Sequence, residues 1–147
     1  MPRIRSLLVF GTLLATLLAA GPAVPAHAAG LRGRMLQLVN RTRVNHDLHR
    51  LRLNLRLSHQ AHRHSARMAA RGEIFHTPDL EALVRPYGAT SWGENVCKAG
   101  TLRRVRTLWM RSSDHRYNML YRAYDHAGVG VVRTHRWVWV TVMFYGR

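Results

Sequence analysis

The chain has 147 residues with 23 Lys or Arg against 7 Asp or Glu, so its formal net charge is +16. Its single cysteine, Cys97, excludes an intrachain disulfide, and a chain of this length buries a core without one. An unpaired thiol is either reactive or a small buried residue, and burial is the commoner state. The charge favours an anionic envelope polymer or lipid as partner. No aromatic-rich strand motif or metal-binding finger supports sequence-specific nucleic-acid binding.

The first 28 residues have the layout of a secretory signal peptide. Arg3 and Arg5 precede an apolar run over residues 7–20, and Ala26-His27-Ala28 fits a small-x-small cleavage site. The run is shorter than the roughly 20 residues that a membrane-spanning helix requires. We therefore expect cleavage after Ala28, secretion without a transmembrane span, and one domain over residues 29–147. An uncleaved anchor is the alternative.

Helical periodicity begins directly after this segment. Residues 31–49 carry apolar side chains at helical spacing, and arginines such as Arg43 lie mostly off the apolar stripe. Residues 51–57 alternate apolar with polar side chains, which fits a strand or an extended connection, and we favour the connection. The next helix is expected to run from an N-cap at Ser58 to a stop at Gly72.

Five histidines on these two helices raise the question of a metal site. On a helical wheel, His62 and His64 flank opposite sides of the buried sector and His59 points away, so these three do not converge on one ion. His46 and His49 are three residues apart, which leaves a weak surface site open. Solvated surface histidines are the preferred interpretation.

A short third helix is expected to open with Thr77 as its cap and Pro78 at its first position, and to end at Pro86 and Gly88. His76 is then held immediately before a rigid helix start.

A glycine-bounded loop that contains Glu94 is expected to lead to a fourth helix, capped by Thr101 and running to Ser112. Ser112 falls in the apolar sector of that helix, so its side chain is predicted to face inward. A short helix through Tyr121 should follow.

The chain ends in a predicted hairpin, with strands over residues 127–133 and 137–145. Both faces of the last strand are apolar, so both should be covered by other elements. Early helices and late strands of this kind predict an α+β fold. The expected architecture is a three-layer α-β-α sandwich with a small antiparallel sheet between helices.

Seven short motifs occur in one order along residues 31–146, and together they make the sequence resemble the CAP superfamily, or SCP domain. This superfamily includes the cysteine-rich secretory, antigen 5 and pathogenesis-related 1 proteins, and the resemblance is closest to its compact, secreted bacterial branch. The motifs are Leu38-Val39-Asn40-x-x-Arg43, Leu53-Asn54-x-x-Leu57-Ser58, Ser65-x-x-Met68-Ala69, Phe75-His76-Thr77-Pro78-Asp79, Gly93-Glu94-Asn95, Trp109-Met110-x-Ser112-x-x-His115-Arg116-x-Asn118-Met119-Leu120 and Gly128-Val129-Gly130. The α-β-α fold that the resemblance implies agrees with the fold predicted above.

The resemblance also implies a central cavity lined by two histidines and two acidic residues. His76 and His115 match the histidines, and Glu94 matches one acid. Ser112 stands where the second acid is expected, so the site should carry one negative charge fewer, unless Asp114 substitutes. The expected cavity neighbours are Asn95, Ser112 and Asp114.

Two imidazoles and a carboxylate form a ligand set for a divalent metal such as zinc. Such a site suits metal-assisted hydrolysis, with Glu94 as the candidate catalytic group. A purely structural hydrogen-bonded network is the other interpretation of the same residues.

The resemblance implies a scaffold reused for sterol or fatty-acid binding, defence and signalling, with disputed enzymatic activity. We therefore expect a secreted, non-enzymatic binding protein whose cavity holds a divalent metal or a small lipid or envelope ligand. A metal-dependent extracellular hydrolase that uses His76, Glu94 and His115 is the alternative.

Overall fold

The computed structural model describes residues 26–147, and the predicted signal peptide lies outside them except for its last three residues. None of the described helices is long and apolar enough to cross a membrane. In chain order the elements are α1 (Ala26–Val44), β1 (Arg52–Leu53), α2 (Leu55–Arg71), α3 (Leu80–Val84), the 3-10 helix η1 (Arg85–Tyr87), β2 (Ser91–Ala99), α4 (Leu102–Arg111), α5 (Ser113–Leu120), β3 (His126–Arg133) and β4 (Val138–Gly146).

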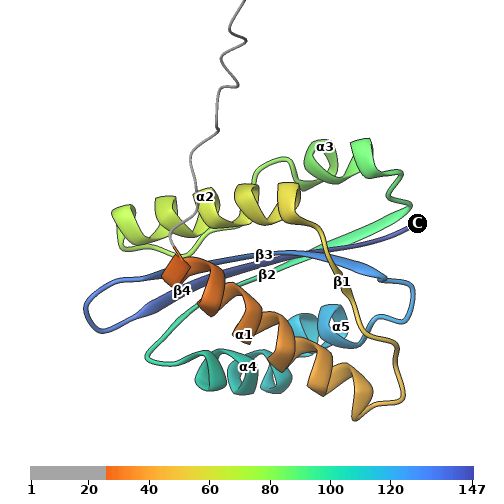
Figure 1. The fold of residues 1–147 in the computed structure, drawn as a ribbon, viewed down its shortest axis with the longest axis horizontal. Helices are drawn as coiled ribbons and strands as arrows, with labels where there is room; N and C mark the ends of the chain where they lie inside the picture. The colour runs from red at the N-terminus through yellow and green to blue at the C-terminus, as the bar shows by residue number, and fades with distance from the viewer. Residues whose placement is uncertain (1–25) are drawn as a thin grey trace, which may run out of the picture.

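The four strands form one sheet in the order β1-β3-β4-β2. β1 is parallel to β3, whereas β4 pairs antiparallel with β3 on one side and with β2 on the other. Helices α2 and α3 cover one face of the sheet, and α1, α4 and α5 cover the other (Figure 1). The predicted three-layer α-β-α sandwich and its terminal hairpin are therefore confirmed.

Strand β4 is buried along its whole length because helices pack on both of its faces. One set of its side chains joins α1 and α4 in the largest core cluster: Val138, Val140, Val142 and Phe144. The alternate set packs beneath α2: Trp139, Met143 and Tyr145. This is the two-sided burial that the apolar pattern predicts.

Cys97 lies in the largest core cluster, with 7% of its surface exposed. Burial raises the pKa of its thiol to about 11, so the unreactive protonated form dominates at neutral pH. Of the two interpretations of this cysteine, the structure supports the buried, structural one.

Several helix boundaries differ from the predicted ones. α1 ends at Val44 rather than near residue 49, and the chain then turns through Asp47 at φ 57°. α2 begins at Leu55 because Asn54, rather than Ser58, caps it. The Ser58 hydroxyl instead donates to the Asn54 carbonyl (2.7 Å) and accepts from the Val129 N–H (3.0 Å), which joins α2 to β3.

The cap of α3 is Asp79, whose Oδ1 accepts from the Ala82 N–H at 2.9 Å. The prediction of Thr77 as cap is wrong because the Thr77 hydroxyl donates to the Glu94 carboxylate instead. The predicted stops at Gly72 and Gly88 are confirmed, and both glycines adopt the left-handed conformation that favours this residue.

Two side chains predicted at the surface, Arg43 and His64, are wholly buried. Each finds hydrogen-bond partners on backbone carbonyls far away in sequence, which a helical wheel does not reveal. His46 and His49 also bond carbonyls, those of Thr42 and Tyr124. Within residues 26–147, no three His, Cys, Asp or Glu side chains are grouped as a metal site.

Candidate functional site

Glu94 lies in the middle of β2, and this is a correction to the predicted loop. Nine residues of β2 pair with β4, and Glu94 stands opposite Met143. The run from Ser91 to Ala99 lacks a clean apolar alternation, so only its pairing with β4 reveals the strand. This pairing places a carboxylate on a rigid element, where 7% of the residue is exposed.

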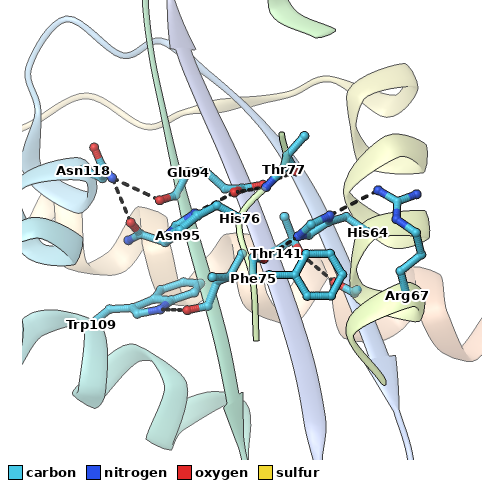
Figure 2. A network of polar contacts seen from close by, with 12 residues as sticks. His64, Arg67, Phe75, His76, Thr77, Glu94, Asn95, Trp109, Asn118 and Thr141 are labelled. Carbon is cyan, nitrogen blue, oxygen red and sulfur yellow. Dashed lines mark hydrogen bonds and ion pairs between the residues drawn. The ribbon is translucent and has the colours of Figure 1, made fainter. Parts of the chain in front are cut away.

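The Glu94 carboxylate contacts His76 and Thr77, which lie shortly before α3 (Figure 2). Its Oε2 accepts from the Thr77 N–H at 2.9 Å and lies 2.8 Å from His76 Nδ1, while Oε1 accepts from the Thr77 hydroxyl. Only 4% of the Glu94 side chain is exposed, against 62% of the His76 side chain. The carboxylate therefore orients the His76 imidazole, most of which remains exposed to solvent.

His115 is held in a comparable way at the start of α5. Its Nδ1 lies 3.0 Å from the Ser112 hydroxyl, and its ring stacks on Trp109. Burial lowers the pKa of His115, and the nearby His76 lowers this pKa further, while Asp114 opposes the shift. His115 is therefore biased toward the neutral imidazole, the form that binds metals.

The three predicted neighbours of the site differ in their burial and in their contacts. Ser112 is not inside α4 but forms the half-buried junction between α4 and α5, and its hydroxyl contacts His115. Asp114 is exposed and accepts from the Ser113 hydroxyl (3.2 Å), so it does not replace the missing acid by pointing inward. Asn95 is wholly buried and donates to the His115 carbonyl at 2.9 Å.

A second amide, Asn118, completes a network that the sequence analysis did not assign. Its Nδ2 donates to the Glu94 carbonyl (3.2 Å) and to Asn95 Oδ1 (3.0 Å). A Cβ at Gly93 would lie 2.5 Å from both Asn118 Oδ1 and the Tyr124 hydroxyl, so a larger residue there would displace these two side chains. These contacts tie α5 to β2 and set the position of His115 relative to Glu94. The only signal in the sequence was the presence of both amides in the motifs.

An open hollow of about 470 Å³ lies beside this carboxylate, and His76, Thr77, Trp92 and Glu94 help to line it. Asp79 and Glu81 also line it, so the hollow gathers three of the chain's seven acidic residues. His115 is not among its lining residues. The hollow is thus a local acidic region in a strongly basic protein, which favours a cation there.

The sequence profile of the CAP family, the cysteine-rich secretory protein family, matches residues 36–144. The chain belongs to the CAP family. No curated protein matches it significantly.

Solved CAP-like structures agree with this fold. An extracellular SCP-domain protein from Bacillus anthracis superposes with a TM-score of 0.67 at 24% identity, over 87% of this chain and 45% of that protein. A cysteine-rich secretory protein from Staphylococcus aureus gives a TM-score of 0.69 at 21% identity, over 86% and 42%. An outer surface protein from Borrelia burgdorferi gives 0.66 at 15% identity, over 78% and 91%. The chain therefore spans less than half of the first two proteins, and these likenesses concern the fold alone.

His64 supports the site of this CAP domain from α2. Its Nε2 lies 2.7 Å from the Phe75 carbonyl, and its Nδ1 lies 3.2 Å from a guanidinium nitrogen of Arg67 (Figure 2). Since a guanidinium only donates, Nδ1 accepts and Nε2 carries the proton. His64 thereby fixes the backbone one residue before His76.

The substitution His64→Phe should lower the free energy of unfolding by about 1–3 kcal/mol, because the half-buried Phe75 carbonyl loses the donor that the buried His64 supplies. Urea unfolding measures the loss. His59→Phe, on the same helix but half-buried, is the matched control and should change stability by less than about 0.5 kcal/mol. Equal effects of the two substitutions would show that the carbonyl contact is unimportant.

Proposed function

We propose that this CAP domain is a secreted binding protein in which His76 and His115 bind a divalent metal ion such as zinc through their Nε2 atoms. The signal-peptide pattern supports secretion, as do the fold neighbours that are described as extracellular or outer-surface proteins. The acidic lining beside His76 supports a cationic ligand.

The observation that carries the proposal is that the Nδ1 atoms of both His76 and His115 are engaged in hydrogen bonds. That of His76 is occupied by Glu94 and that of His115 by Ser112, so in each ring Nε2 is left for a ligand. Metal-binding imidazoles commonly donate the other ring N–H to a carboxylate. This hydrogen bond fixes the tautomer and increases the basicity of the metal-binding nitrogen. Glu94 therefore enters the proposal as the group that orients His76, since its own oxygens are already engaged.

The residues present favour binding over catalysis. A bound zinc ion would supply a Lewis-acid centre with positions open to a ligand. Ser112 and His115 form a serine–histidine contact, but within residues 26–147 no carboxylate hydrogen-bonds to this imidazole to orient it as a general base. The Glu94 carboxylate positions the chain at His76 and Thr77 rather than facing a nucleophile.

Zinc binding to the purified, metal-free protein tests the proposal by isothermal titration calorimetry. We expect one ion per chain, and a loss of affinity of at least about a hundredfold in His76→Ala and in His115→Ala. Glu94→Gln should weaken binding by about tenfold, the effect expected of an orienting group. His135→Ala, on the exposed turn between β3 and β4, is the matched control and should bind as the wild type does.

Zinc affinity that is unchanged in both histidine variants would contradict the proposed site. Hydrolysis of peptide, ester or peptidoglycan substrates that requires zinc and disappears in Glu94→Gln would instead favour the extracellular hydrolase.

A further inference from the structure

A second concavity, which we call the arginine groove, lies between α1 and α4 on elements that contribute no residue to the proposed metal site. It has a volume of about 450 Å³. Arg41 of α1 and Asn45, directly after α1, line one side, and Arg103, Arg106 and Thr107 line it from α4. Both helices lie on the same face of the sheet (Figure 1).

Three arginines line this groove without a counter-charge. Arg103 and Arg106 are one helical turn apart, so they project from the same side of α4, and α1 supplies Arg41. None of the seven acidic residues of the chain lines the groove. In the part of the chain that the structure describes, none of the three arginines forms an ion pair.

This arrangement differs from the rest of the basic surface. The hollow beside Arg56 and Arg147 is also basic, but Arg147 lies 4.0 Å from the Asp125 carboxylate, which partly neutralises it. In the arginine groove, Arg106 is half-buried, so its charge is less screened by water than that of an exposed arginine. Like charges that converge on a concave surface repel one another, and a bound anion relieves this repulsion.

We infer that the arginine groove binds the phosphate group of an anionic ligand. Guanidinium groups match phosphate because they donate two parallel hydrogen bonds to its oxygens, and three of them from two helices surround the anion. The groove is larger than one phosphate, so it has room for a second phosphate or for an ester substituent. The inference does not depend on the metal site, because the two sites share no residue.

Binding of inorganic pyrophosphate at about 0.15 M salt tests the inference by calorimetry, since this salt screens exposed charges. The triple variant Arg41→Gln, Arg103→Gln, Arg106→Gln should bind on the order of thirtyfold more weakly than the wild type. The control triple variant Arg63→Gln, Arg133→Gln, Arg136→Gln removes the same charge from exposed positions. It should lose no more than about threefold.

Two further probes distinguish the sources of the phosphate. If the groove variant, but not the control variant, loses affinity for soluble glycerol phosphate, the ligand is a free phosphate ester. If this selective loss of affinity is seen only with phosphatidylglycerol-containing vesicles, the ligand is a lipid headgroup. Equal losses in the two triple variants, or no saturable binding of any probe, would overturn the inference. Urea unfolding and zinc titration of the groove variant separate this result from misfolding and from failure of the metal site. We expect a urea midpoint no lower than that of the wild type and unchanged zinc affinity. If the triple variant does not fold, Arg103→Gln alone provides the test, with an expected loss of about threefold against no measurable loss in the exposed control Arg63→Gln.

Discussion

The substitution Arg43→Met is expected to lower the free energy of unfolding by about 3–5 kcal/mol. The side chain is wholly buried, and its guanidinium donates to four backbone carbonyls at 3.0–3.2 Å. The four acceptors belong to the loop after α1 (His49), to the last turn of α5 (Met119) and to the segment that joins α5 to β3 (Tyr121 and Tyr124).

The size of the effect follows from the nature of these partners. A buried salt bridge can be replaced by apolar residues at little cost, because both partners are removed. Backbone carbonyls cannot be removed, so Arg43→Met leaves them with fewer donors, and those of Met119 and Tyr124 are buried. The Tyr124 carbonyl keeps the contact with His49 Nε2, which limits the total loss to less than four full hydrogen bonds.

Urea unfolding of Arg43→Met, Arg43→Lys and Arg41→Met measures this role. Lysine carries one compact ammonium group, which cannot reach carbonyls on separate segments as a planar guanidinium does, so Arg43→Lys should lose most of the same stability. Arg41 is exposed on the same helix, and Arg41→Met should change stability by less than about 0.5 kcal/mol. A loss below about 1 kcal/mol in Arg43→Met would show that the buried contacts contribute little.

The substitution Gly130→Ala is expected to prevent α2 from packing on the sheet, with a loss of more than about 3 kcal/mol or failure to fold. A Cβ at this position would collide with backbone atoms of Ala61 and His62 on α2. Backbone atoms inside a helix do not move aside as the end of a flexible side chain does. The whole helix would have to shift, which would also break the contacts of Ser65 with Thr141 and with the Gly130 carbonyl.

Soluble yield and urea unfolding of Gly130→Ala and Gly100→Ala provide the measurement. Gly100 is exposed, nothing lies within 4 Å of a Cβ built there, and its φ is not positive. Gly100→Ala should therefore change stability by less than about 0.5 kcal/mol. A Gly130→Ala protein with the wild-type urea midpoint would mean that α2 can move away from β3 at little cost.

The candidate site was predictable only in its composition. The motif resemblance selected His76, Glu94 and His115, and the structure shows that His76 contacts Glu94, whereas His115 contacts Ser112. It also shows that the two amides, Asn95 and Asn118, connect the strand to α5. Their roles depend on hydrogen bonds between residues 20 or more positions apart, which no local pattern encodes. Whether a metal binds there stays a prediction.

The sequence by itself determined the layers of this protein. Apolar patterns with periods of 3.6 and 2 residues are local properties. They were sufficient to predict α2, α4 and the hairpin of β3 and β4, including the burial of both faces of β4. The tertiary structure alone decided which polar side chains are buried. Arg43 and His64 read as surface residues because their partners are carbonyls 6–81 residues away, and β2 became visible only through its pairing with β4. A polar group can be buried only where the fold supplies its hydrogen bonds, and that supply is set by contacts between distant segments.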